Sequence, residues 1–280
     1  MTSIRELFEE YSYRPRKSAG QNFLTDNQIL DKIEKAIDCP PGDILLEVGG
    51  GYGALTERLL KKEKPLTVVE VDHKLFAMLE KKFSTSPNLR LIKGDILKTD
   101  LAPLAPPFPA KLTVAGNIPY YLTTPLITKL LTQYHPIVRR VFLMVQKEVA
   151  DRLEAKPGTK DYSALTICAQ YYSVVKRVVE VPARCFKPRP KVDSAFIELV
   201  FKPQLPLEKT AEKAFFGLVR AIFQSRRKVI TNSLKSIGKT QEQVLSALNK
   251  TGLDPQIRGE KLGIEKLMEL SRALEAEASL

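Results

Sequence analysis

Short apolar runs alternate with helical patterns along residues 44–200. Predicted strands, rich in aliphatic and β-branched residues, lie at 43–48, 66–71, 88–92, 112–116 and 140–145. Between them, apolar positions recur with helical spacing over 54–62, 73–83 and 124–133. Strands that alternate with helices in this way form a parallel sheet that helices cover on both faces. The pattern therefore predicts an α/β fold.

Two further segments, 173–181 and 192–201, are β-rich and joined by a short irregular link, which predicts an antiparallel strand pair at one edge of the sheet. After Pro203 and Pro206 the pattern changes. Helical spacing then continues over 208–223, 226–237, 241–249 and 264–277. We therefore expect two domains, an α/β domain at 1–202 and a smaller all-helical domain at 203–280.

Composition excludes several classes of protein. Of the 280 residues, 44% are hydrophobic, which excludes a disordered chain. The longest apolar runs, such as 141–145, are far shorter than the ~20 residues that a transmembrane helix needs. The N-terminal residues lack the apolar segment of a signal peptide, so we expect a cytoplasmic protein without membrane contact.

Cysteines and histidines are few and dispersed. Cys39, Cys168 and Cys185 form no paired pattern, which indicates free thiols in a reducing compartment. The two histidines have no ligand spacing with these cysteines, so we expect no metal site.

Basic residues outnumber acidic ones by 44 to 32, which gives a net charge of +12. They gather in clusters, several beside prolines or aromatic residues. These are Arg14, Arg16 and Lys17; Arg139 and Arg140; Arg184, Lys187, Arg189 and Lys191; and Arg226, Arg227 and Lys228. A single charged run is usually a solvated surface, but this clustering favours a polyanion partner. We expect the last two clusters to bind nucleic acid.

A glycine-rich turn, Gly49-Gly50-Gly51-Tyr52-Gly53, follows the first predicted strand. Glycines such as Gly49 and Gly51 let the backbone turn tightly and approach a ligand, as in nucleotide sites of α/β sheets. By itself this turn is a weak signal, and a purely structural turn is the alternative interpretation. The spacing differs from the G-x-G-x-x-G of NAD-binding proteins, and Glu47 before the turn is unfavourable beside a diphosphate.

Two carboxylates at later strand ends indicate which nucleotide fits. Glu70 ends the second predicted strand and can accept hydrogen bonds from both ribose hydroxyls. Asp95 follows the third and can accept one from the exocyclic amine of adenine. A ribose and an adenine without phosphate describe S-adenosylmethionine, so we predict this methyl donor.

The fourth predicted strand ends in Gly116-Asn117-Ile118-Pro119-Tyr120, which fits methylation of an aromatic exocyclic amine. The Asn117 side-chain oxygen and the Ile118 carbonyl can accept both N–H bonds of the amine and direct its lone pair to the methyl group. Pro119 stiffens the turn, and Tyr120 can stack on the base. Such catalysis rests on positioning and electrostatics. Ordinary turn chemistry is the alternative.

Phe186 precedes an extended loop in which prolines alternate with Lys187, Arg189 and Lys191. Ordinary packing would explain this phenylalanine. Phe186 could equally stack on one face of a base extruded from RNA, with Tyr120 stacking on the other face.

Together these motifs resemble the ribosomal RNA adenine dimethyltransferase family. The matching stretches are 17–24, 47–53, Glu70, 94–95, 117–120, 186–195 and 223–228. The resemblance implies a Rossmann-like class I S-adenosylmethionine-dependent methyltransferase domain. It implies donor contacts from Asn22, Leu24, Gly49, Glu70, Asp95 and Asn117, to which the turn glycine Gly51 is added.

The same resemblance implies a reaction and its partners. The reaction is N6,N6-dimethylation of two adjacent adenosines in the 3′-terminal hairpin loop of small-subunit (16S) rRNA. We accordingly expect small-subunit rRNA and the pre-30S ribosomal particle as partners of a monomeric enzyme, with the basic clusters as RNA-binding residues.

Two alternatives on the same fold stay open, and a third interpretation, a dehydrogenase, fails. A large-subunit rRNA methylase of the macrolide-resistance type shares the Asn-Ile-Pro-Tyr and Phe-x-Pro-x-Pro patterns, but the chain length and residues 224–228 favour the small-subunit enzyme. A non-catalytic nucleic-acid-binding factor on the same fold is opposed by the intact motif at 117–120. The glycine spacing argues against a dehydrogenase.

Overall fold

The computed structural model describes residues 8–11, 13–15, 20–224 and 228–277. The chain forms two compact units. The first comprises Met1–Ala150 and Tyr172–Phe201, and the second comprises Asp151–Tyr171 and Lys202–Leu280, each in its described part.

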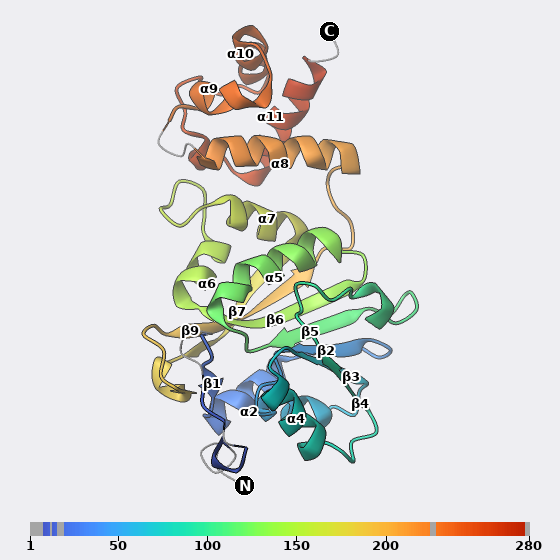
Figure 1. The fold of residues 1–280 in the computed structure, drawn as a ribbon. Helices are drawn as coiled ribbons and strands as arrows, with labels where there is room; N and C mark the ends of the chain where they lie inside the picture. The colour runs from blue at the N-terminus through green and yellow to red at the C-terminus, as the bar shows by residue number, and fades with distance from the viewer. Residues whose placement is uncertain (1–7, 12, 16–19, 225–227, 278–280) are drawn as a thin grey trace. The chain divides into compact units, whose positions relative to one another are not determined.

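A seven-stranded sheet forms the centre of the first unit, in the order β4-β3-β2-β5-β6-β9-β7 (Figure 1). Its strands are β2 (Ile44–Val48), β3 (Leu66–Glu70), β4 (Leu89–Lys93), β5 (Leu112–Gly116), β6 (Val138–Gln146), β7 (Ser173–Val181) and β9 (Ser194–Phe201). The five neighbouring strands β4, β3, β2, β5 and β6 pair in parallel, whereas β9 runs antiparallel to both β6 and β7. The predicted sheet and its antiparallel edge are therefore confirmed.

Helices cover both faces of this sheet. They are α2 (Asn27–Ala36), α3 (Ala54–Leu60), α4 (His73–Lys82) and α5 (Tyr120–Gln133). Helix α6 (Lys147–Glu154) begins in the first unit and ends in the second. Figure 1 shows α5 on one face and α2 and α4 on the other. Asp72 caps α4, because its carboxylate accepts hydrogen bonds from the backbone N–H groups of Lys74 and Leu75.

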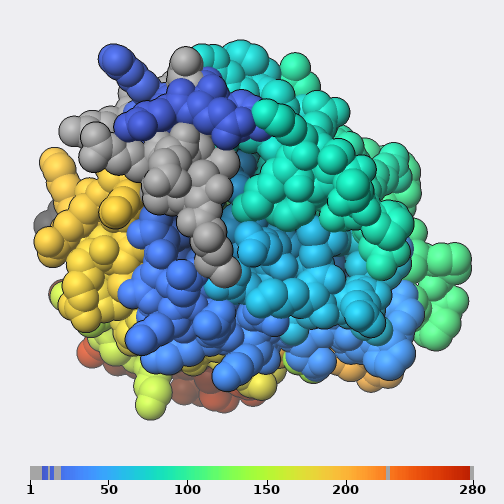
Figure 2. All heavy atoms as spheres, turned by 90° about the horizontal axis from the view of Figure 1, so that it is seen from below, coloured from blue at the N-terminus to red at the C-terminus, as the bar shows by residue number. Residues whose placement is uncertain are grey.

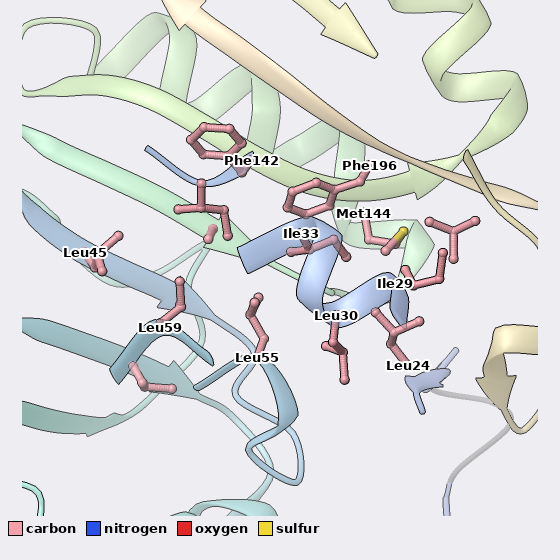
Figure 3. Close-up of a cluster of buried hydrophobic side chains, with 14 of the residues drawn as sticks. Leu24, Ile29, Leu30, Ile33, Leu45, Leu55, Leu59, Phe142, Met144 and Phe196 are labelled. Atoms are coloured by element: carbon pink, nitrogen blue, oxygen red, sulfur yellow. The ribbon is translucent and has the colours of Figure 1, made fainter. Parts of the chain in front are cut away.

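The hydrophobic core lies between the sheet and helices α2 and α3. Ile33 of α2 and Leu59 of α3 are almost fully buried, as are Phe142 and Phe196 on β6 and β9. Figure 3 shows these side chains pointing toward one another across the space between helix and sheet. Burial of each such side chain stabilises the fold by about 1.5–3 kcal/mol. This core fixes the strand ends on which the site is built.

A small separate sheet joins two distant segments of the first unit. Strand β1 (Phe23–Leu24) pairs antiparallel with β8 (Phe186–Lys187), which follows the 3-10 turn η3 (Ala183–Cys185). A second 3-10 turn, η2 (Ala102–Leu104), precedes β5.

The second unit is helical in its described part. Its elements are α7 (Ala164–Tyr172, of which the last residue belongs to the first unit), α8 (Lys209–Gln224), α9 (Ile230–Ser233), η4 (Leu234–Ile237), α10 (Gln241–Lys250), η5 (Gly259–Lys261) and α11 (Ile264–Ala276). The helix expected over 226–237 is instead short helix α9 followed by η4, and residues 225–227 lie outside the described residues.

One boundary between the units lies between Phe201 and Lys202, and Asp151–Tyr171 groups with the C-terminal helices. The ring of Tyr171 stacks on Phe215 of α8 at 5.4 Å between centroids. The buried Tyr162 hydroxyl donates to the Leu262 carbonyl at 3.0 Å. An amphipathic helix has the same sequence pattern whichever partner it packs on, so these contacts are not visible in the sequence.

Among the described residues, no helix combines the length and apolar character needed to cross a membrane.

Candidate active site

The carboxyl ends of β2, β3, β4 and β5 meet at one edge of the sheet. Strand β2 lies between β3 and β5, so the connections leave it in opposite directions. Ligands of open α/β sheets bind at such a reversal point. A cavity of about 270 Å³ lies there.

The cavity brings together every residue predicted for the methyl donor. Its lining includes Asn22, Leu24, Gly49, Gly51, Glu70, Asp95 and Asn117. Pro119 also lines it, whereas Tyr120 and Phe186 do not. Seven residues that are spread over almost a hundred positions of the sequence therefore line the same cavity.

The glycine-rich turn passes close to its neighbours. Gly51 has a φ of 56°, and a Cβ there would lie 3.3 Å from the ring of Phe23. A Cβ on Gly50 would lie 2.7 Å from side-chain carbons of Leu79 and Val68, closer than packed carbons can approach. The glycines therefore let the turn pack tightly between these side chains and line the cavity with backbone.

Glu70 is 5% exposed and is held by two backbone N–H groups. Its Oε2 accepts from Gly51 and its Oε1 from Asp72, both at 2.9 Å. Burial raises the pKa of Glu70, and these hydrogen bonds oppose the rise. Each carboxylate oxygen has two lone pairs, so both oxygens can accept a further hydrogen bond from a ligand in the cavity.

Glu47 lines the same cavity and is 1% exposed. Its Oε2 has no hydrogen-bond partner within the described part of the chain. Burial raises the pKa of Glu47 to about 8, and the charge of nearby Glu70 acts in the same direction. A buried carboxyl with an unpaired oxygen favours a cationic ligand, because a positive charge compensates the lost hydration.

Lys129 of α5 fixes the loop that carries Asp95. Its Nζ donates to the carbonyls of Ile96, Leu97 and Thr99 at 2.8–3.0 Å. Asp95 in turn accepts from the Leu97 N–H at 2.9 Å. Burial lowers the pKa of Lys129, and the charge of Asp95 opposes this. Sequence reasoning missed Lys129, because a lysine on an amphipathic helix gives no sign of three carbonyl partners.

The amide of Asn117 is oriented by the N-terminal segment. Its Nδ2 donates to the backbone carbonyl of Asn22 at 3.2 Å. The other edge of the amide, Oδ1, receives no hydrogen bond from the described residues, and Asn117 is one of the residues that line the cavity. This orientation leaves an acceptor for a substrate N–H.

Tyr120 and Phe186, the two aromatic residues predicted to stack on the target base, do not line the cavity. Tyr120 is half-buried, and its hydroxyl shares a hydrogen bond of 2.7 Å with Ser194 Oγ. Phe186 is 2% exposed and packs in the core cluster with Leu24 and Cys185. A base can stack on the Phe186 ring only after the side chains that cover it have moved.

Two exposed apolar side chains in the cavity lining were missed from the sequence. Val71 is 63% exposed and follows Glu70, and Tyr121 is 64% exposed and follows Tyr120. The sequence signal that could have identified them as cavity residues is their position directly after the motif residues Glu70 and Tyr120. Large exposed apolar side chains beside a cavity indicate a surface that a ligand covers.

The predicted RNA-binding residues divide between the units. Arg184, Lys187, Arg189 and Lys191 are all exposed around β8 in the first unit. Figure 2 shows this loop (yellow) on the same face as the N-terminal residues (dark blue). Lys228 is exposed in the second unit, whereas Arg226 and Arg227, like Arg16 and Lys17, lie outside the described residues.

Comparison with known families decides what this site belongs to. Residues 13–276 match the family described as Ribosomal RNA adenine dimethylase. The chain belongs to this family.

Individual members of the family and solved structures agree with the assignment. The chain is 44% identical to Ribosomal RNA small subunit methyltransferase A of Geobacillus sp. (strain WCH70), over 97% of this chain and 95% of the relative. It is 42% identical to the protein of that name from Moorella thermoacetica, over 96% of each. A dimethyladenosine transferase from Plasmodium falciparum superposes with a TM-score of 0.78, at 27% identity, over 91% of this chain and 98% of that one.

The 23S rRNA methyltransferase ErmE superposes with a TM-score of 0.70, at 28% identity, over 91% of this chain and all of that one. Membership of the ribosomal RNA adenine dimethylase family confirms the expected methyltransferase fold. It also confirms the expected activity, methyl transfer from S-adenosylmethionine to adenine in rRNA.

Proposed function

We propose that this protein dimethylates N6 of two adjacent adenosines in the 3′-terminal hairpin loop of small-subunit rRNA. The observation that carries the choice of subunit is the similarity over nearly the whole chain to small-subunit methyltransferases. The proposal includes the pre-30S particle as physiological substrate, a monomeric enzyme and a cytoplasmic location.

The cavity residues fit S-adenosylmethionine. The free lone pairs of Glu70 suit the two ribose hydroxyls, the exposed side chain of Val71 suits a flat adenine face, and Asp95 suits its exocyclic amine. The buried, unpaired oxygen of Glu47 suits the positive charge of the donor. When bound, the donor supplies a methyl group activated by its sulfonium. No metal takes part in this proposal.

In this proposal, Asn117 and Ile118 accept the hydrogen bonds of the target amine. The Nδ2–Asn22 hydrogen bond holds the amide so that Oδ1 can accept one N–H of the amine. The Ile118 carbonyl accepts the other, and Pro119 fixes the turn between them and Tyr120. Two acceptors aimed at the two N–H bonds draw the nitrogen lone pair out of conjugation with the ring, which is catalysis by positioning.

RNA binding is assigned to both units. Exposed cations around β8 would contact phosphates near the cavity. The helical domain at 203–280 would bind more distant backbone through Lys228 and its neighbours Arg226 and Arg227. Tyr120 and Phe186 would stack on the extruded base once Phe186 is uncovered.

The test uses methyl-labelled donor with small ribosomal subunits that lack dimethyladenosine, and large subunits in parallel. We expect label at two adjacent adenosines near the 3′ end of small-subunit rRNA only. The matched variant Asn117→Ala should lose ~10²-fold or more in rate, by analogy with loss of one transition-state hydrogen bond. Label only in the large subunit would instead establish the macrolide-resistance type of activity.

A further inference from the structure

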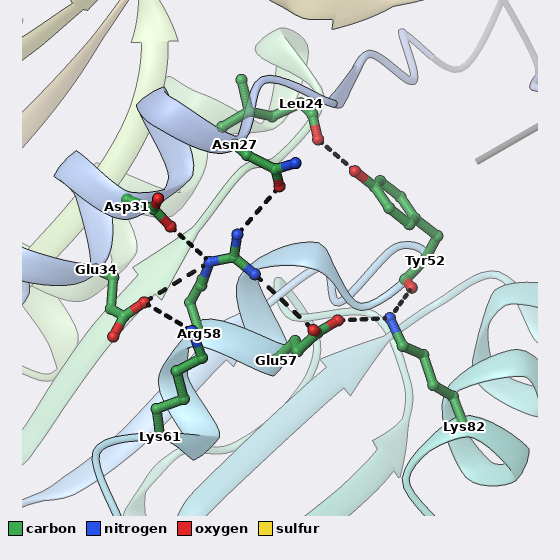
Figure 4. Close-up of polar contacts among 9 residues, drawn as sticks. All are labelled: Leu24, Asn27, Asp31, Glu34, Tyr52, Glu57, Arg58, Lys61 and Lys82. Carbon is green, nitrogen blue, oxygen red and sulfur yellow. Dashed lines mark hydrogen bonds and ion pairs between the residues drawn. The ribbon is translucent and has the colours of Figure 1, made fainter. Parts of the chain in front are cut away.

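Residues 22–25, called here the linking segment, form part of the donor cavity. Asn22, Phe23 and Leu24 line it. The Phe23 ring lies against Gly51 of the glycine-rich turn, 3.3 Å from the position of an added Cβ. From the next residue of that turn, the Tyr52 hydroxyl donates to the Leu24 carbonyl at 2.5 Å (Figure 4).

The same segment holds the acceptor side of the site. Leu24 is paired with Phe186 in the β1–β8 ladder. Thr25 donates to the Cys185 carbonyl twice, through its N–H at 2.9 Å and its Oγ1 at 3.2 Å. Asn22 accepts the hydrogen bond that orients Asn117. The basic loop begins at Lys187, directly after these contacts.

The chain that follows the linking segment is firmly anchored. Arg58 of α3 is 6% exposed, and its Nε lies 3.0 Å from Asp31 Oδ1 on α2. Its Nη2 donates a hydrogen bond to Asn27 Oδ1, in the first turn of α2, at 3.1 Å. Figure 4 shows Arg58 between these residues and Leu24 beside Tyr52. The C-terminal end of the linking segment is therefore attached to a helix that is held in place.

The ladder between β1 and β8 is by contrast short. It comprises two residues on each strand and is separate from the seven-stranded sheet. A two-stranded pair alone is at best marginally stable in water, so its order depends on what packs against it. A donor bound in the cavity would pack against β1, because Phe23 and Leu24 line that cavity, and RNA bound to Lys187, Arg189 and Lys191 would restrain β8.

We propose that the linking segment couples the two sites, so that a bound donor strengthens binding of the RNA substrate and the RNA strengthens binding of the donor by the same factor. Each ligand orders the ladder and the Asn117 amide that the other one uses, and the second ligand to bind loses less conformational freedom. This inference rests on the proposed function, because it takes the cavity for the donor and the β8 loop for RNA.

The experiment is a binding cycle without turnover. The affinity of the full-length protein for small subunits lacking dimethyladenosine is measured with and without saturating S-adenosylhomocysteine, which has no methyl group to transfer. We expect RNA affinity to rise about fivefold or more with the ligand, within the usual range of coupling between sites.

Two variants weaken the contacts of the linking segment. Tyr52→Phe removes the hydroxyl bond to Leu24, and Thr25→Val removes the hydroxyl bond to Cys185. Both should bring the affinity ratio toward one. Matched controls remove comparable bonds elsewhere: Tyr134→Phe, whose hydroxyl donates to Asp100 at 3.0 Å, and Thr132→Val, whose hydroxyl donates to the Thr128 carbonyl at 2.8 Å. These should keep the wild-type ratio.

An unchanged RNA affinity on adding S-adenosylhomocysteine to wild type would overturn the coupling. So would a retained ratio in both linking-segment variants. Methylation of the small subunit by the same preparation separates this outcome from failure of the proposed function, since an enzyme with independent sites still transfers methyl groups.

Discussion

The buried carboxyl of Glu47 should make the stability of the empty protein fall as pH rises. Its pKa in the folded protein is about 8, against an ordinary value of 4.5. Between these values the unfolded chain has released the proton while the folded chain still holds it. The folded state then binds more protons, so unfolding becomes easier with each step in pH. The stabilisation is complete below pH 4.5 and is lost by about pH 8.

The magnitude follows from the size of the pKa difference. Each pKa unit corresponds to about 1.4 kcal/mol, so Glu47 accounts for a loss on the order of 5 kcal/mol in unfolding free energy across this range. Glu47→Gln carries a neutral amide at every pH. Any packing cost of the amide is constant with pH, so the stability difference between variant and wild type isolates the titration.

The assay is urea denaturation followed by circular dichroism from about pH 5 to about pH 8.5, without donor. The stability of Glu47→Gln relative to wild type should rise by about 1.4 kcal/mol per pH unit up to about pH 8 and then level off. Glu80→Gln, an exposed position on α4, should follow wild type. Parallel pH curves for Glu47→Gln and wild type would refute the reasoning and show that water or a neighbouring group compensates the Glu47 charge.

Three further predictions address other parts of the site. Glu70→Ala should raise the dissociation constant of the donor on the order of tenfold or more, since charge-assisted hydrogen bonds to the ribose are lost; unchanged affinity by calorimetry would leave Glu70 only its bonds to Gly51 and Asp72. Lys129→Met should weaken the donor about tenfold, because three carbonyl bonds to the Asp95 loop disappear. Turnover of this variant at saturating donor should change little. An equal loss in donor affinity and in turnover would point to a general defect in folding. Replacing Lys187, Arg189 and Lys191 by Gln should make the salt dependence of RNA binding shallower by roughly two units, at ~0.7–0.9 per phosphate contact. Donor affinity should stay constant, and an unchanged slope would exclude phosphate contacts by this loop.

Local patterns determined much of this protein without its structure. A strand shows itself through β-branched apolar runs, so β3 and β5 were predicted within one residue of their bounds. The glycine-rich turn and the motif at 117–120 each follow a strand directly. Because parallel strands end at one edge of the sheet, their residues could be expected to meet Glu70 and Asp95 there. These residues line one cavity, and the contact of each of them with donor or RNA stays a prediction.

Contacts between distant segments were decided only by the tertiary structure. Phe186 has the same sequence neighbours whether its ring faces a base or the core, and packing against Leu24 and Cys185 places it in the core. The β1–β8 ladder is too short to leave a periodic pattern, and Lys129 finds its carbonyls about thirty residues earlier in the chain. Asp151–Tyr171 joins the C-terminal helices through Tyr162 and Tyr171. Hydrophobic periodicity states which face of an element is buried, and only the folded chain selects the surface that covers it.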